Sequence, residues 1–133
     1  MTQMNKKLIH SELSYVLNGI FFKIHNKLGR FAREKQYSDV LEEEFKSQNI
    51  NHKREIDLNS SGNRFDFLIE NKIVVEVKAK PFVTKSDYYQ VNRYLESSGI
   101  ELGLIVNFRH RYLKPKRIVN AKLYYSDISD KTI

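Results

Sequence analysis

The sequence predicts an α/β domain with a mixed central β-sheet flanked by helices, in the element order ααβββαββ. Three observations lead to this fold class. Apolar residues recur at steps of three and four in the first third of the chain, the period changes to two in the middle, and a further helical pattern separates two apolar strands. The length of 133 residues and the absence of repeats or linkers indicate one domain over residues 1–133. We expect residues 1–10 to be a flexible segment and residues 121–133 a carboxy-terminal extension.

Two amphipathic helices are expected first. The first spans residues 11–28, where one apolar stripe recurs at helical spacing; Ser11 is its candidate cap and Gly29 its stop. The second spans residues 32–48 and has an apolar face that begins at Tyr37.

Strands are expected over residues 52–58, 64–69 and 73–79, separated by turn-forming residues at 59–63 and 70–71. In the second strand, the alternation places one set of side chains on one face (Phe65, Phe67, Ile69) and another set on the opposite face (Asp66, Leu68).

The remaining elements are a third helix and two strands. The helix spans residues 85–97, opens with a Thr84–Asp87 capping box and stops at Gly99. Residues 102–107 are apolar enough for a strand buried on both faces, and a short strand is expected over 117–119.

Composition excludes several classes of protein. The chain has no Cys, which rules out a disulfide scaffold, a thiolate metal site and a Cys nucleophile. The histidines lack zinc-ligand spacing, and no glycine-rich phosphate loop is present. No apolar stretch approaches the ~18 residues of a membrane span, and the start lacks the apolar core of a secretory signal. We expect a soluble cytoplasmic protein without a membrane partner.

The basic excess favours a polyanionic partner. There are 23 Lys and Arg against 16 Asp and Glu, a net charge of +7. One cluster without an acidic residue holds the candidate nucleic-acid-binding residues: Arg109, Arg111, Lys114, Lys116 and Arg117. A solvated basic face is the alternative interpretation of this cluster.

The candidate chemistry lies on two neighbouring strands. Glu76 and Lys78 are two residues apart, so their side chains share a face, and Asp66 lies on the preceding strand of a predicted hairpin. Two carboxylates and a lysine suit phosphodiester hydrolysis, because Mg²⁺ prefers oxygen ligands and a lysine offsets developing charge. An ordinary cross-strand charge pair on a wet face is the alternative.

Two helices add candidates to this set. Glu34, near the start of the second helix, falls on or near its apolar face. Gln90 and Tyr94 are four residues apart, so they share one face of the third helix. Helix-dipole complementarity for Glu34 and a surface position for Gln90 remain open.

Together these residues resemble the PD-(D/E)XK nuclease superfamily. The resemblance rests on Asp66, on Glu76-Val77-Lys78 and on the segment from Gln90 to Tyr94, which is similar to the RecB-like branch. More narrowly, the chain resembles the GxxExxY proteins over about residues 12–120. Two departures occur: Phe31 occupies the position of the family glycine, and Phe65 that of the superfamily proline.

The resemblance implies a restriction-endonuclease-like core with a metal site. Asp66, Glu76 and the Val77 main-chain carbonyl would hold Mg²⁺, with Mn²⁺ as a substitute, and Glu34 would reach the metal through water. Lys78 would be the catalytic lysine, Gln90 would support the metal-bound water or a phosphate, and Tyr94 would pack beside it.

Three functions remain open on the sequence. The first is a metal-dependent nuclease acting on DNA or RNA. The second is a nucleic-acid-binding module of nuclease fold with weak or no activity. The third is a subunit of a repair or defence complex, because the chain has several exposed-looking tyrosines and aromatic residues are common at interfaces. A homodimer is also open, because cleavage of two strands by so small a nuclease is easier for a dimer.

Overall fold

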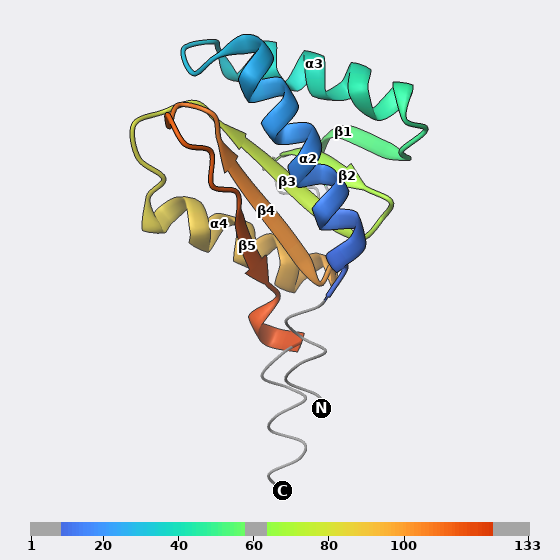
Figure 1. The fold of residues 1–133 in the computed structure, drawn as a ribbon. Coiled ribbons are helices and arrows are strands. Elements are labelled where there is room, and N and C mark those ends of the chain that lie inside the picture. Colours follow the sequence, from blue (N-terminus) through green and yellow to red (C-terminus); the bar gives the residue numbers. More distant parts are fainter. Residues whose placement is uncertain (1–8, 58–63, 124–133) are drawn as a thin grey trace, which may run out of the picture.

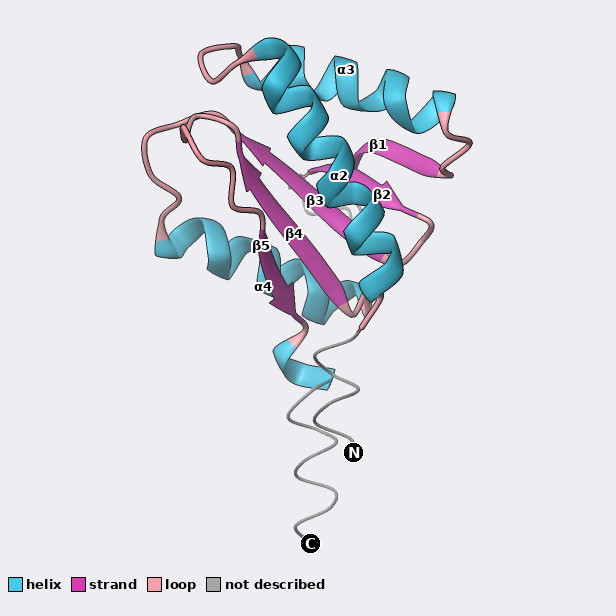
Figure 2. Cartoon of the chain, in the orientation of Figure 1, coloured by secondary structure: helices cyan, strands magenta, loops and turns pink. Residues whose placement is uncertain are grey.

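The computed structural model describes residues 9–57 and 64–123. The predicted turn at 59–63 and Leu58 lie outside these ranges, as do most of the predicted terminal segments 1–10 and 121–133. The chain forms the following elements in order (Figures 1 and 2): α2 (Ser11–Leu28), α3 (Glu34–Ser47), β1 (His52–Ile56), β2 (Phe65–Ile69), β3 (Ile73–Lys78), α4 (Lys85–Ser98), β4 (Leu102–Asn107) and β5 (Lys116–Val119).

The strands form one five-stranded mixed sheet in the order β1-β2-β3-β4-β5. β1, β2 and β3 pair antiparallel as a meander, β3 and β4 pair parallel, and β5 returns antiparallel to β4. Because a parallel pair needs a crossover connection, α4 links β3 to β4. This arrangement confirms the predicted fold class and element order.

Helices cover both faces of the sheet. Figure 1 shows α2 and α3 on one face and α4 on the other. Phe21 of α2 and Phe45 of α3 belong to the larger apolar core, with Val75 of β3. Val91 and Leu95 of α4 pack on the opposite face in a second apolar cluster. All six residues of β4 are buried, so its predicted burial on both faces is confirmed.

Several element ends differ slightly from the predictions. α3 begins at Glu34 instead of residue 32, β1 ends at Ile56, α4 extends to Ser98, and β5 begins at Lys116. The expected cap at Ser11 is wrong: Ser11 is already helical, and His10 takes the cap position without a side-chain hydrogen bond. Such ends depend on one or two hydrogen bonds, which local sequence specifies weakly.

The predicted alternation of β2 is wrong at one residue. Phe67 and Ile69 face the larger core as expected, but Phe65 packs with Leu68 and Tyr94 in the cluster beneath α4. The β1–β2 register keeps one offset throughout, but no bridge joins Glu55 to Asp66 between the pairs Arg54–Phe67 and Ile56–Phe65. Glu55 has a positive φ of 55°, and Ile56, the partner of Phe65, packs against the same cluster as Phe65.

Gly103 lets α4 approach the sheet. A Cβ atom at this position would lie 2.8 Å from Cγ1 of Val91 and 3.5 Å from Cδ1 of Leu95. Val91 is buried and its β-branched side chain has little rotamer freedom, so it cannot move away cheaply. The glycine therefore sets the distance between α4 and β4.

We expect Gly103→Val to destabilise the fold by about 1–3 kcal/mol, because it overpacks the α4–β4 contact. Gly19→Ala is the matched control: a Cβ atom at this helical glycine would meet nothing within 4 Å, and Ala should stabilise α2 by up to ~1 kcal/mol. Urea unfolding of the three proteins measures both effects. Equal stability of Gly103→Val and the parent would contradict this packing argument.

Candidate active site

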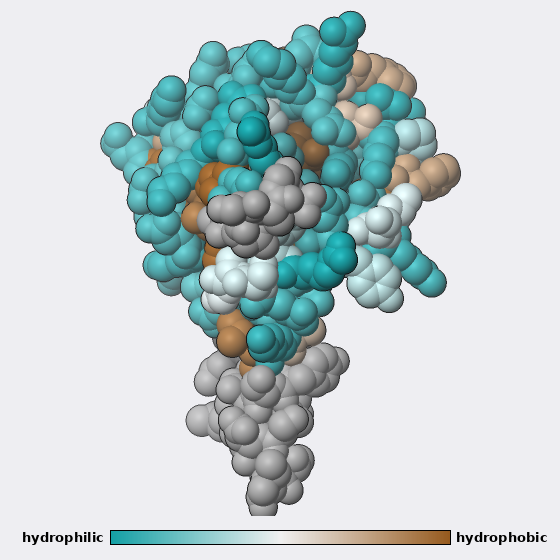
Figure 3. All heavy atoms as spheres, turned by 180° about the vertical axis from the view of Figure 1, so that it is seen from behind, coloured by the Kyte–Doolittle hydropathy of each residue, from teal (hydrophilic) through white to brown (hydrophobic). Residues whose placement is uncertain are grey.

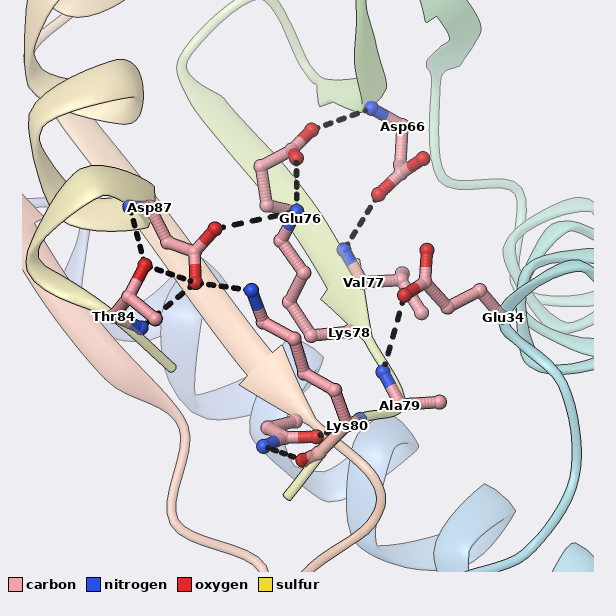
Figure 4. A network of polar contacts seen from close by, with 10 residues as sticks. Glu34, Asp66, Glu76, Val77, Lys78, Ala79, Lys80, Thr84 and Asp87 are labelled. Atoms are coloured by element: carbon pink, nitrogen blue, oxygen red, sulfur yellow. Dashed lines mark hydrogen bonds and ion pairs between the residues drawn. The ribbon is translucent and has the colours of Figure 1, made fainter. Parts of the chain in front are cut away.

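The strands β2 and β3 separate at one end, and two carboxylates fill the gap. Ladder pairing between them ends at Phe67 and Val75. Beyond that pair, the Val77 N–H donates to Oδ2 of Asp66 at 2.6 Å, and the Asp66 N–H donates to Oε1 of Glu76 at 3.0 Å (Figure 4). The side chains thus satisfy backbone donors that strand pairing leaves free. This places both acidic groups side by side between the strands.

Lys78 points toward the same spot. It follows Glu76 by two residues on β3, so both side chains lie on the face opposite Val75 and Val77, as predicted. Its Nζ lies 3.7 Å from Oε2 of Glu76. The Lys78 side chain is 19% exposed, so its ammonium is largely shielded yet reachable from solvent.

Glu34 approaches the carboxylates from α3. It is the first residue of that helix, and its Oε2 accepts the N–H of Ala79 at 3.3 Å, directly after β3 (Figure 4). One turn on, Tyr37 is fully buried, stacks on Phe108 with ring centroids 4.2 Å apart and donates to the Gly29 carbonyl. The Tyr37 contacts therefore fix the start of α3 beside the end of β3.

Burial dominates the electrostatics of the two central carboxylates. It raises the pKa of Glu76 to about 8, and the negative charge of Asp66 adds to the effect while Lys78 opposes it. Burial also raises the pKa of Asp66, against the hydrogen bond from Val77. The negative charge of Glu34 raises the pKa values of both groups further. The cluster holds more carboxyl groups than one lysine can balance, which is why ionisation of Asp66 and Glu76 is disfavoured.

Asp87 is a site neighbour that sequence reasoning assigned only to helix capping. The predicted capping box with Thr84 is confirmed, and the same carboxylate lies 3.8 Å from Nζ of Lys78 and 2.5 Å from Nζ of Lys80. Partial burial opposes its charged form, but hydrogen bonds from Lys80 and Thr84 outweigh that and lower the pKa of Asp87. The sequence signal that could have indicated this role is the short connection that separates Asp87 from Lys78 and Lys80.

The two predicted residues of α4 lie at different depths. Tyr94 is buried, with 4% of its surface exposed, and contacts the ring of Phe65. Gln90 is exposed, and no hydrogen bond within the described residues involves its side chain. No hydrogen bond joins Gln90 to Asp66 or Glu76, and its support of a metal-bound water or a phosphate stays a prediction.

The predicted basic cluster divides into two groups. Arg109 and Arg117 hold the chain together: Arg109 donates to the carbonyls of Arg30 and Ala79, and Arg117 donates to Oγ of Ser14 and the carbonyl of Ile9. Arg111, Lys114 and Lys116 line a hollow next to the site, together with Arg109. Arg117 lies on the opposite face of β5, so the structure separates it from the others.

Asn107 closes the connection after β3 and was missed by sequence reasoning. It is buried, its Nδ2 donates to the Lys80 carbonyl at 2.7 Å, and its Oδ1 accepts the N–H of Lys80 at 3.2 Å. A polar residue at the end of an apolar strand is the signal that could have found it. The asparagine thus continues the β3–β4 pairing with its side chain.

The donor set suits a hard divalent cation. Among residues 9–57 and 64–123, no group of three or more His, Cys, Asp or Glu side chains is already arranged to hold a metal ion. The available oxygens are those of Asp66 and Glu76, with Glu34 nearby, and carboxylate oxygens are preferred by Mg²⁺ and Mn²⁺. Two buried carboxylates that repel each other gain from a cation, so the residues fit such an ion in chemistry.

Comparison with known proteins decides the family. The model of the PD-(D/E)XK nuclease superfamily matches residues 11–119. The chain belongs to the PD-(D/E)XK nuclease superfamily. The match spans Asp66 and Glu76-Val77-Lys78, and nucleases of this superfamily generally use divalent metal ions. No curated protein and no solved structure matched the chain.

The family assignment agrees with the architecture, since a mixed sheet with helices on both faces is consistent with a restriction-endonuclease-like PD-(D/E)XK fold. No helix in the described part of the chain combines the length and apolarity needed to cross a bilayer.

We expect Glu76→Gln to stabilise the metal-free protein at pH 8 by about 1–3 kcal/mol and to have a much smaller effect at pH 5. The raised pKa of Glu76 means that the folded protein retains a proton that the unfolded chain releases. The parent should therefore lose stability as the pH rises from about 5 to 8. Urea unfolding in EDTA measures this, with Glu43→Gln on the exposed face of α3 as the control. An equal gain in the free energy of unfolding of Glu76→Gln at pH 5 and pH 8 would contradict a raised pKa of Glu76.

Proposed function

We propose that this chain is a metal-dependent nuclease that hydrolyses phosphodiester bonds in nucleic acid, with DNA as its polymer. The convergence of Asp66, Glu76 and Lys78 at the separated end of β2 and β3 carries the proposal. Within the superfamily, the order of motifs supports the GxxExxY proteins and the RecB-like branch.

In this proposal, Asp66, Glu76 and the Val77 carbonyl hold Mg²⁺, with Glu34 reaching it through water. Mn²⁺ serves as a substitute because it accepts the same oxygen ligands. When bound, the ion would polarise the phosphoryl oxygen and lower the pKa of bound water. The backbone hydrogen bonds of Asp66 and Glu76 orient their carboxylates before any ion arrives, which reduces the reorganisation that binding requires.

Lys78 supplies a positive charge at the reacting phosphate. Its ammonium is held between Glu76 and Asp87, at 3.7 and 3.8 Å from their oxygens, so it is directed at the site rather than into bulk water. A fixed cation next to the scissile phosphate offsets the charge that builds in the transition state. Asp87 acts as a positioning residue, because it contacts Lys78 and anchors the start of α4.

A nucleic-acid-binding module without cleavage activity is the second candidate. It is favoured by the cations that surround the hollow beside the site, because phosphate binding by these residues does not require the carboxylates.

We expect Lys78→Ala to lower the cleavage rate by about 100-fold or more, the usual cost of one transition-state donor. The assay uses linear duplex DNA, single-stranded DNA and RNA in Mg²⁺, Mn²⁺ or EDTA. Lys72→Ala is the matched control, because Lys72 also follows an acidic residue by two positions but lies exposed in the β2–β3 turn. Cleavage by Lys78→Ala at the parent rate, or cleavage that persists in EDTA, would reject the assignment.

We expect 10 mM Mg²⁺ to stabilise the parent protein by about 1.4 kcal/mol, for a dissociation constant of about 1 mM. The stabilisation should appear as a rise in Tm of about 3–7 °C. Asp66→Asn retains an acceptor for Val77 but removes the charge, so its Tm should respond much less. Potassium chloride at equal ionic strength controls for screening. The same rise in both proteins would show that the ion binds elsewhere.

A further inference from the structure

A hollow of about 830 Å³ opens at the edge where β3 and β4 end. Three connections meet there: the α2–α3 connection, the β3–α4 connection and the β4–β5 connection (Figure 1). Arg109 joins them, since it donates to the carbonyls of Arg30 and Ala79 in the other two segments. These bonds make the hollow a built feature of the fold.

The lining of the hollow is cationic. Five of its residues carry positive charge: Arg30, Arg109, Arg111, Lys114 and Lys116. The described residues that line it include no Asp or Glu. The charge of the wall therefore complements a polyanion.

Aromatic rings stand at the same edge with most of their surface in solvent. Phe31, Phe82 and Tyr112 line the hollow and are 73%, 78% and 70% exposed. Apolar side chains gather at this edge in an otherwise mainly hydrophilic face (Figure 3). Exposing three large apolar rings to water is unfavourable, and the fold gains nothing from it. Such exposed apolar patches mark binding sites.

Arginines already stack on two of these rings. The guanidinium of Arg30 lies 4.8 Å from the centre of the Phe31 ring, and that of Arg111 lies 5.4 Å from the centre of the Tyr112 ring. These contacts hold each guanidinium over a ring and leave the opposite face of that ring to a ligand. The Phe82 ring has no aromatic partner among the described residues and is open to a ligand.

The hollow adjoins the carboxylate cluster. Ala79 connects the two, because its N–H donates to Glu34 and its carbonyl accepts from Arg109. On the sheet, Ile105 and Asn107 line the hollow and pair in register with Glu76 and Lys78. A strand bound in the hollow would reach the site without leaving the protein surface.

We propose that this hollow binds an unpaired nucleic-acid strand, with bases stacked on Phe82 and Tyr112 and phosphates held by Lys114 and Lys116. The proposal rests on the proposed function, for which it names a single-stranded substrate region. Stacking requires a free base face, which a duplex conceals, whereas an unpaired strand presents one at every nucleotide. The hollow holds both exposed rings and cations, the two kinds of group that stack bases and bind phosphates in such a strand.

The experiment measures binding of full-length protein in EDTA to fluorescein-labelled oligonucleotides of one sequence: single-stranded DNA, single-stranded RNA and duplex DNA. The test variant is Phe82→Ala with Tyr112→Ala. The control is Tyr15→Ala with Phe22→Ala, two exposed aromatics on α2 outside the hollow. The DNA and RNA probes distinguish the two sources of an unpaired strand.

We expect the test variant to lose about 10-fold or more of its affinity for an unpaired strand, within the usual effect of losing stacked bases. Its affinity for duplex should change less than about twofold, and the control should bind as the parent does. Lys114→Ala with Lys116→Ala should reduce the slope of the logarithm of the binding constant against the logarithm of the salt concentration. The reduction should be about 0.7 for each lost phosphate contact.

Three outcomes would overturn the inference: equal affinity of the test variant and the parent for the unpaired strand, an equal loss for duplex, or no binding of any probe. The last would indicate a protein-binding surface. Unpaired-strand binding that depends on Phe82 and Tyr112, without cleavage in Mg²⁺ or Mn²⁺, would reject the nuclease proposal and retain this one. Cleavage that is lost in Lys78→Ala but unchanged in the variant with Phe82→Ala and Tyr112→Ala would support the nuclease proposal and reject strand binding in the hollow.

Discussion

The parallel pairing of β3 with β4 is the constraint on which the rest of the structure depends. A parallel pair cannot be closed by a tight turn, so the chain must cross one face of the sheet, and α4 does so. Gly103 allows α4 to lie close to β4. The same pairing brings the carboxyl ends of both strands to one edge, where Lys78 and Asn107 lie opposite each other. The candidate site and the hollow both form at that edge.

The candidate site is built from an interruption in secondary structure. Where β2 leaves β3, Asp66 and Glu76 use their side chains to accept backbone hydrogen bonds that a continued ladder would have made. These side-chain hydrogen bonds hold the two carboxylates in place. Burial, however, raises their pKa values and disfavours the charged forms. A site that binds a cation accepts this cost, because the charge that destabilises the empty protein attracts the ion.

The basic residues have separate tasks, although the sequence presents them as one cluster. Arg117 ties β5 to the start of α2, and Arg109 ties three connections together. Lys114 and Lys116 remain exposed at the hollow. Some basic side chains therefore stabilise the fold through hydrogen bonds, and others are available to bind a polyanion. Asp87 combines two roles in the same way, as a helix cap and as a partner of Lys78 and Lys80.

The helices and strands, their order and the shared face of Glu76 and Lys78 follow from the sequence alone, because helical and strand periods are local properties of the chain. The sequence also placed Asp66 on the neighbouring strand. The packing of the elements settles what local periods leave open: Phe65 turns away from Phe67, Asp66 points between the strands, Gln90 stays exposed, and Arg109 and Arg117 separate. These outcomes depend on the absence of a bridge between Glu55 and Asp66 and on contacts between residues far apart in sequence, such as Arg30 with Arg109 and Ser14 with Arg117. Local periodicity carries no information about such contacts, since they arise when whole elements pack against one another.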